Sequence, residues 1–116
     1  MATITRIEAG SRMSKAVVHG DTVYLAGIVA DDNSQDVTGQ TRQILAEIDR
    51  LLALAGTDNS KLLRANIWLS DIATFGQMNA VWDAWVSPGN TPARATVEAS
   101  LATPDYKVEI MVVAAK

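Results

Sequence analysis

Hydrophobic and polar residues alternate along two short runs near the start of the chain, residues 13–19 and 22–28. Alternation with a period of two is typical of β-strands, because successive side chains point to opposite faces of a sheet. Gly20-Asp21 lies between the two runs and suits the tight turn of a hairpin. We therefore expect an antiparallel pair of strands in this part of the chain.

A helix is predicted after the polar segment 31–36. Its apolar residues recur at spacings of three and four, which places them on one buried stripe. The stripe consists of Ile44, Leu45, Ile48, Leu51, Leu52 and Ala55. Asp36 is placed to cap the start of this helix, and Gly56 is placed to end it.

Residues 63–70 alternate again and predict a third strand. A second helix follows, with Thr74 and Gln77 at the spacing of a capping box and the dipeptide 88–89, Pro-Gly, as its end. The apolar face of this helix is made of Phe75, Met78, Trp82 and Trp85. Because these side chains have helical spacing, we expect the aromatic rings in the core rather than around a ligand.

Two further strands are expected at residues 93–99 and 107–114. The resulting order, ββαβαββ, predicts an α+β fold in which a mixed sheet carries both helices on one face. A chain of 116 residues is the right length for one domain, so residues 1–116 are expected to form a single unit.

The parity of the strands divides the predicted sheet into two faces. The face under the helices is expected to contain Val23, Leu25, Ala65, Ile67, Leu69, Ala95, Val97, Val108, Ile110 and Val112. The opposite face is mixed and contains Tyr24, Ala26, Arg64, Asn66, Trp68, Arg94, Thr96, Glu98, Glu109, Met111 and Val113. Its tyrosine, tryptophan, methionine and valine are too apolar for a face left in water. We therefore expect other copies of the chain to cover it.

The composition excludes several classes of function. The chain has no cysteine, which excludes disulfides, thiol nucleophiles and thiolate metal sites, and one histidine, His19, which argues against zinc and a Ser-His-Asp triad. A net charge of −3 argues against nucleic acid as a partner. No apolar run approaches the roughly 18 residues of a membrane span, and residues 1–6 do not resemble a signal peptide. We expect a soluble cytoplasmic protein without a bound metal or a membrane partner.

Arg94 and Glu109 are the residues of the mixed face with the most distinctive chemistry. A guanidinium presents a planar fork that matches a carboxylate, so Arg94 suits the binding of an acid substrate. A carboxylate in a partly desolvated crevice can orient or deprotonate a water molecule, which suits Glu109. The residues alone favour a simpler interpretation, in which the two form a structural ion pair at a subunit boundary.

A known pattern covers nearly the whole chain, from about residue 13 to residue 114. The segments 92–98, PARATVE, and 107–110, KVEI, resemble the signature of the RidA/YjgF family of enamine/imine deaminases. Segment 25–27, LAG, stands where this family usually has a Ser-Gly pair, and Asn79 stands at its asparagine position. The segments NAVWDAW and PDYKVEI are most similar to the YoaB-type subgroup.

The resemblance implies a chorismate-mutase-like fold and a homotrimer with its sites in clefts between subunits. It implies that Arg94 clamps a substrate carboxylate and that Glu109 positions the attacking water. The expected reaction is hydrolysis of a 2-imino acid, the tautomer of an enamine such as 2-aminoacrylate, to a 2-oxo acid and ammonia. The family needs no cofactor for this step. Its substrate-binding set corresponds to Arg94, Gly27, Thr96, Asn79 and Met13.

This chain departs from the family pattern at three positions. Met13 stands in place of a tyrosine in the cleft, Ala26 in place of a serine, and Thr96 in place of a cysteine. The departures leave open a second function, a non-catalytic trimer that binds small carboxylates or partner proteins. A rearrangement of the chorismate-mutase type is suggested by fold analogy alone. For the last two strands, a simple hairpin is the alternative to the family arrangement, which places the last strand between two earlier ones.

Overall fold

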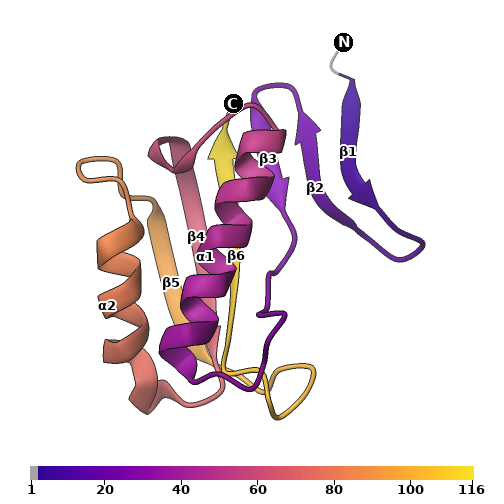
Figure 1. Ribbon diagram of the computed structural model, residues 1–116. Helices are drawn as coiled ribbons and strands as arrows, with labels where there is room; N and C mark the ends of the chain where they lie inside the picture. Colours follow the sequence, from indigo (N-terminus) through magenta and orange to yellow (C-terminus); the bar gives the residue numbers. More distant parts are fainter. Residues whose placement is uncertain (1–2) are drawn as a thin grey trace.

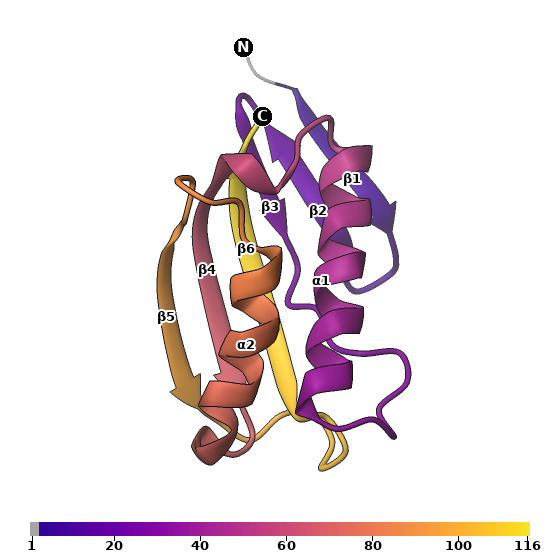
Figure 2. The ribbon, with the colours of Figure 1, turned by 60° about the vertical axis from the view of Figure 1, so that its left-hand side comes forward.

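The computed structural model describes residues 3–116, which form one mixed sheet and two α-helices (Figure 1). In chain order the elements are β1 (Ile4–Ala9), β2 (Ser14–His19), β3 (Thr22–Leu25), α1 (Val37–Leu54), η1 (Asn59–Lys61), β4 (Leu62–Leu69), η2 (Ile72–Thr74), α2 (Phe75–Trp85), β5 (Ala93–Glu98) and β6 (Val108–Ala115). The six strands follow the order β1-β2-β3-β6-β4-β5, and both helices cover the same face (Figures 1 and 2). The predicted α+β class is confirmed.

The core lies between the sheet and the helices. Strands β3, β4 and β6 bury the side chains predicted for this face: Val23, Leu25, Ala65, Ile67, Leu69, Val108, Ile110 and Val112. The predicted stripe of α1 is buried against them. Asp36 caps α1, because its carboxylate accepts a hydrogen bond from the Gly39 N–H at 2.9 Å. Gly56 follows the helix with φ of +83°, a conformation that favours glycine at a helix end.

The hydrophobic pattern does not predict the first strand, β1. Its isoleucines, Ile4 and Ile7, are three residues apart and lack the alternation of a half-buried strand. β1 nevertheless pairs antiparallel with β2 at the edge of the sheet. Arg50 of α1 donates to both carboxylate oxygens of Glu8, at 2.6 and 3.0 Å, and this hydrogen-bonded contact lowers the pKa of Glu8. The element order is therefore βββαβαββ rather than ββαβαββ.

β6 is the last strand in the chain and lies between β3 and β4, antiparallel to both. β5 runs parallel to β4 at the edge of the sheet, so the hairpin alternative for the last two strands is wrong. The buried side chain of Gln40 fixes the connection into β6. Its amide group donates to the Asp105 carbonyl at 2.9 Å and accepts from the Lys107 N–H at 2.9 Å.

The start of α2 differs from the prediction. Thr74 makes no side-chain capping bond to the helix, and its hydroxyl donates to the Asp71 carbonyl at 2.6 Å. The capping box expected from Thr74 and Gln77 is therefore wrong. A short turn, η2, precedes the helix instead, and Asp71 caps that turn. Met78 and Trp82 are buried as expected, whereas Phe75 keeps 39% of its surface exposed.

The side chains of β5 point the opposite way from the prediction. The parallel register places Arg94 beside Ala65 and Thr96 beside Ile67, so both belong to the helix-covered side. The reversal applies along the strand: Arg94, Thr96 and Glu98 lie on the helix side, and Ala95 and Val97 lie on the other. β5 is an edge strand, and on its helix side Arg94 and Thr96 are half-buried while Glu98 is exposed. Polarity therefore does not identify the solvent face of this strand.

Within residues 3–116 no element covers the second face of the sheet (Figure 2). Tyr24 and Val97 on this face are 47% and 49% exposed. Trp68, Met111 and Val113 are half-buried there. The expected mixed apolar face is present, and its coverage by other copies of the chain stays a prediction.

Candidate functional site

Arg94 lies between β5 and the start of α2. The central carbon of its guanidinium is 5.3 Å from the ring centroid of Trp82 and 5.8 Å from that of Phe75. These distances are within the range of cation–π attraction. The ion pairs found among residues 3–116 are both made by Arg50, so aromatic rings rather than a carboxylate hold the Arg94 charge.

Two buried polar atoms belong to the same part of the molecule. The Asn79 Oδ1 and Thr96 Oγ1 atoms are buried and have no hydrogen-bond partner among residues 3–116. Thr96 follows Arg94 by two residues on the same side of β5. Asn79 is four residues after Phe75 and three before Trp82, so it shares the helix face that carries the two rings. We call these five residues the arginine group. Most buried polar atoms in folded proteins are paired with protein groups or ordered water, so these two atoms are distinctive features of this part of the chain.

Glu109 lies on the other face of the sheet. It is half-buried on β6, opposite Trp68 of β4. Burial of the carboxylate raises the pKa of Glu109 above its ordinary value. Gly27 makes room for this side chain, since a methyl group at Gly27 would overlap the Glu109 Oε2 atom and lie 3.1 Å from its Cδ.

Met13 lies in the same region as Gly27. It precedes β2 at the end of the β2–β3 pair where Gly27 follows β3, and it is 52% exposed. Its carbonyl accepts a hydrogen bond from the Gly10 N–H at 2.7 Å. We call Glu109, Gly27 and Met13 the glutamate group. An exposed methionine at this place offers an adaptable apolar surface and no hydroxyl.

Arg94 and Glu109 do not come together within one chain. They belong to opposite faces of the sheet, and β4 lies between their strands. The expected shared face is therefore wrong, because the parity of β5 is reversed. The predicted residues form two separate halves. One half contains Arg94, Thr96 and Asn79, and the other contains Glu109, Gly27 and Met13.

Sequence analysis misses the part played by Phe75 and Trp82, which it assigns to the core. The available signal is their spacing of seven residues, with Asn79 between them, on a helix that packs over the arginine strand. The spacing predicts a contact with Arg94 only when the side of the sheet on which Arg94 lies is known.

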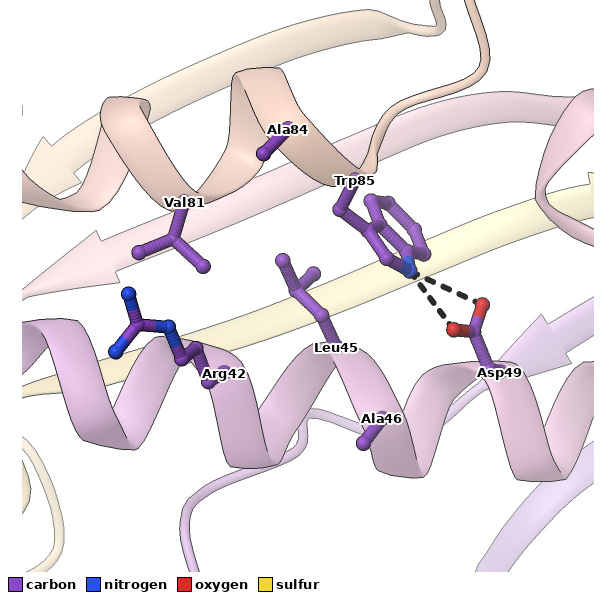
Figure 3. Close-up of a pocket in the computed structure, with 7 residues that line it drawn as sticks. All are labelled: Arg42, Leu45, Ala46, Asp49, Val81, Ala84 and Trp85. Carbon is purple, nitrogen blue, oxygen red and sulfur yellow. Dashed lines mark hydrogen bonds between the residues drawn. The ribbon is translucent and has the colours of Figure 1, made fainter.

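A groove of about 300 Å³ lies between α1 and α2 (Figure 3). It is lined by Arg42, Leu45, Ala46, Asp49, Val81, Ala84 and Trp85, none of which is a predicted site residue. The Trp85 indole N–H donates to both carboxylate oxygens of Asp49, at 3.0 Å each. Across residues 3–116 no three His, Cys, Asp or Glu side chains gather as a metal site. No helix in this range is long and apolar enough to cross a membrane.

A family model described as Endoribonuclease L-PSP matches residues 3–116. The YoaB protein of Escherichia coli, described as a RutC family protein, is 46% identical over 113 residues, which are 97% of this chain and 98% of that protein. The chain belongs to the YjgF/RidA family. The predicted membership of its YoaB-like subgroup is confirmed as well.

Solved structures of YjgF/RidA proteins have the same fold. A YjgF family member from Neisseria meningitidis superposes with a TM-score of 0.96 at 43% identity, covering 98% of this chain and 95% of that one. A member of the YjgF/YER057c/UK114 family from Mycobacterium tuberculosis has a TM-score of 0.88 at 27% identity, covering 98% of this chain and 100% of that one. The arrangement of strands and helices is therefore that of the YjgF/RidA family.

Proposed function

We propose that this protein hydrolyses reactive 2-imino acids, the tautomers of enamines such as 2-aminoacrylate, to 2-oxo acids and ammonia. The observation that supports the proposal most is the separation of two incomplete halves: among residues 3–116, Arg94 has no carboxylate partner and the half-buried Glu109 has no cationic one. A substrate that carries a carboxylate beside an electrophilic carbon is complementary to both. Family membership provides independent support.

The two halves are completed by assembly in this proposal. The chain forms a homotrimer, and the arginine group of one subunit faces the glutamate group of its neighbour. The exposed apolar surface around Tyr24 and Val97 supports this arrangement, because a monomer would leave it in water. Light scattering is expected to give a mass near that of three chains, and the mass of a single chain at micromolar concentration would contradict the assembly.

The residues divide the chemistry between them. Arg94 binds the substrate carboxylate through paired N–H groups and orients the C2=N bond. Glu109 takes a proton from a water molecule while the water oxygen forms a bond to C2 of the iminium. It then passes that proton to the nitrogen, the C–N bond breaks, and the C2=O bond forms. The departing ammonia accepts the proton of the new C2 hydroxyl group and leaves as ammonium. The raised pKa of Glu109 strengthens it as the base for this step. No cofactor takes part in the proposed reaction.

The direct test is a coupled assay. A dehydratase generates 2-aminoacrylate from serine, and the rate of pyruvate formation is compared with and without this protein. We expect acceleration above the spontaneous hydrolysis rate and loss of most of it in the Arg94→Lys variant. A wild-type rate equal to the spontaneous rate would contradict the proposed hydrolysis.

A non-catalytic carboxylate-binding trimer is the second candidate. The departures at Met13 and Ala26 favour it, since they remove two hydroxyl groups that the family places near the reacting atoms. Calorimetry with pyruvate separates the two candidates. Pyruvate binding without turnover would support the binding protein, whereas turnover would reject it.

A further inference from the structure

We infer that Phe75 and Trp82 are positioning residues that form an aromatic clamp on Arg94. The guanidinium carbon lies 5.8 Å from one ring centroid and 5.3 Å from the other. Both rings come from α2, whereas the arginine comes from β5. The substrate that the clamped arginine binds rests on the proposed function. The clamp itself is a property of the folded chain and can be tested without turnover.

An arginine on an edge strand needs such a support. Arg94 has a long flexible side chain on β5, which has one neighbouring strand, β4. A carboxylate partner would hold the guanidinium but would occupy the N–H groups required by an acid ligand. Aromatic rings attract the charge through their π-electrons and leave those N–H groups available. The clamp therefore reduces the mobility of Arg94 without competing with its ligand.

The two rings contribute in different ways. Trp82 is only 4% exposed and is fixed by packing, with the Trp85 ring centroid 5.3 Å away. Trp82 therefore offers Arg94 a rigid, buried aromatic surface. Phe75 is 39% exposed and lies at the rim, where it meets both solvent and the guanidinium. Phe75 is therefore the ring whose replacement disturbs the fold least.

A hydrogen bond connects β5 to the turn that precedes α2. The Ile72 N–H of η2 donates to the Glu98 Oε1 atom at 3.0 Å. Glu98 is four residues after Arg94 on β5, and η2 leads directly into Phe75 at the start of α2. This bond joins the strand that carries the arginine to the turn that positions the first ring. The hydrogen bond therefore fixes β5 to the chain segment next to Phe75, the exposed ring of the clamp.

The test compares Phe75→Leu with Phe75→Tyr. Leucine keeps an apolar side chain but removes the π-face, whereas tyrosine keeps the face. We expect Phe75→Leu to weaken pyruvate binding, and to raise KM in the deaminase assay, by about two- to fivefold, with kcat and the thermal midpoint little changed. Phe75→Tyr is expected to restore wild-type values. Phe75→Tyr is thus the matched control, because it changes the same position and keeps the aromatic face.

An NMR measurement makes the test independent of catalysis. The Arg94 Nε–H resonance, assigned by its loss in Arg94→Lys, is expected to show a ring-current shift and a rigid heteronuclear NOE. Both are expected to decrease in Phe75→Leu and in Trp82→Leu, and to persist in Phe75→Tyr and Trp82→Phe.

The results separate failure of the clamp from failure of the proposed function. A wild type without turnover, but with these NMR effects, would reject the hydrolysis and keep the clamp. Wild-type pyruvate binding together with an unchanged Arg94 resonance in Phe75→Leu would overturn the clamp. Equal losses in Phe75→Leu and Phe75→Tyr would overturn it as well.

Discussion

The arginine group and the glutamate group hold their charges in contrasting ways. Arg94 is stabilised within its own chain by two aromatic rings. Glu109 is half-buried on the uncovered face, where desolvation raises its pKa and no ion pair among residues 3–116 offsets this. The charge of Arg94 is therefore stabilised in the isolated chain, whereas the charged form of Glu109 is disfavoured there by desolvation. The difference indicates that the glutamate half gains most from a neighbouring subunit and its ligand.

The largest expected effect is the loss of turnover in Glu109→Gln. Glutamine is nearly isosteric and can hydrogen-bond a water molecule, but it cannot accept the proton. General-base assistance contributes about 10²–10⁴-fold, and we expect a loss of kcat in that range. Pyruvate binding, measured by calorimetry, is expected to remain. A near-normal rate would remove Glu109 from the mechanism, and dissociation into monomers would assign its main role to the interface.

Arg94→Lys is expected to produce the next largest effect. Lysine keeps the charge but loses the bidentate fork. A lost charge-assisted hydrogen bond is worth roughly 1.5–3 kcal/mol, so kcat/KM should fall by about ten- to a hundredfold. Coupled kinetics and light scattering measure this, with the oligomer expected to stay intact. Unchanged turnover would reduce Arg94 to a structural residue.

A smaller loss of activity is expected for Gly27→Ala. The added methyl group would overlap the Glu109 carboxylate, which is the flexible end of a side chain, so it can move aside at little cost in stability. The catalytic group is then displaced while the fold persists. A pH–rate profile together with a thermal melt tests this. Equal activity in the two proteins would show that the position of the Glu109 carboxylate is unimportant.

The smallest effect concerns stability and pH. Burial raises the pKa of Glu109 above the ordinary value of 4.5, because it disfavours the charged carboxylate. The neutral carboxyl group is therefore compatible with the folded state at low pH. Folding stability is lost as the pH rises above 4.5 and through the folded-state pKa. In subunits diluted until they separate, Glu109→Gln should therefore unfold at slightly higher urea concentration than the wild type at pH 7. The difference should vanish at pH 4. A variant less stable at pH 7 would show that Glu109 has a favourable partner.

Local patterns predict the fold well where capping and burial agree. Asp36, the stripe of α1 and Gly56 together define the first helix, and the tertiary structure does not alter them. The pattern fails for β1, because an edge strand held by pairing and by Arg50 needs no buried face. It also fails for the start of α2, where Asp71 competes with the expected cap.

The residues of the candidate site are recognisable from the sequence, but their arrangement is not. Arg94 and Glu109 are identified by residue type and by the family pattern. Their faces depend on whether β5 pairs with β4 or with β6, and both pairings are compatible with the same alternation of side chains. The pairing is a long-range property, so the aromatic surroundings of Arg94 could be assigned only from the folded structure.

The central position of β6 has a consequence for the synthesis of this protein. It is the last strand to leave the ribosome, yet it joins the β1-β2-β3 half of the sheet to the β4-β5 half. Until it is made, β3 and β4 each present an open hydrogen-bonding edge in the nascent chain. Such edges are sites of intermolecular pairing, and long-range strand insertion is slow. The sheet is therefore completed only after β6 has left the ribosome, and the edges of β3 and β4 stay open to intermolecular pairing until then.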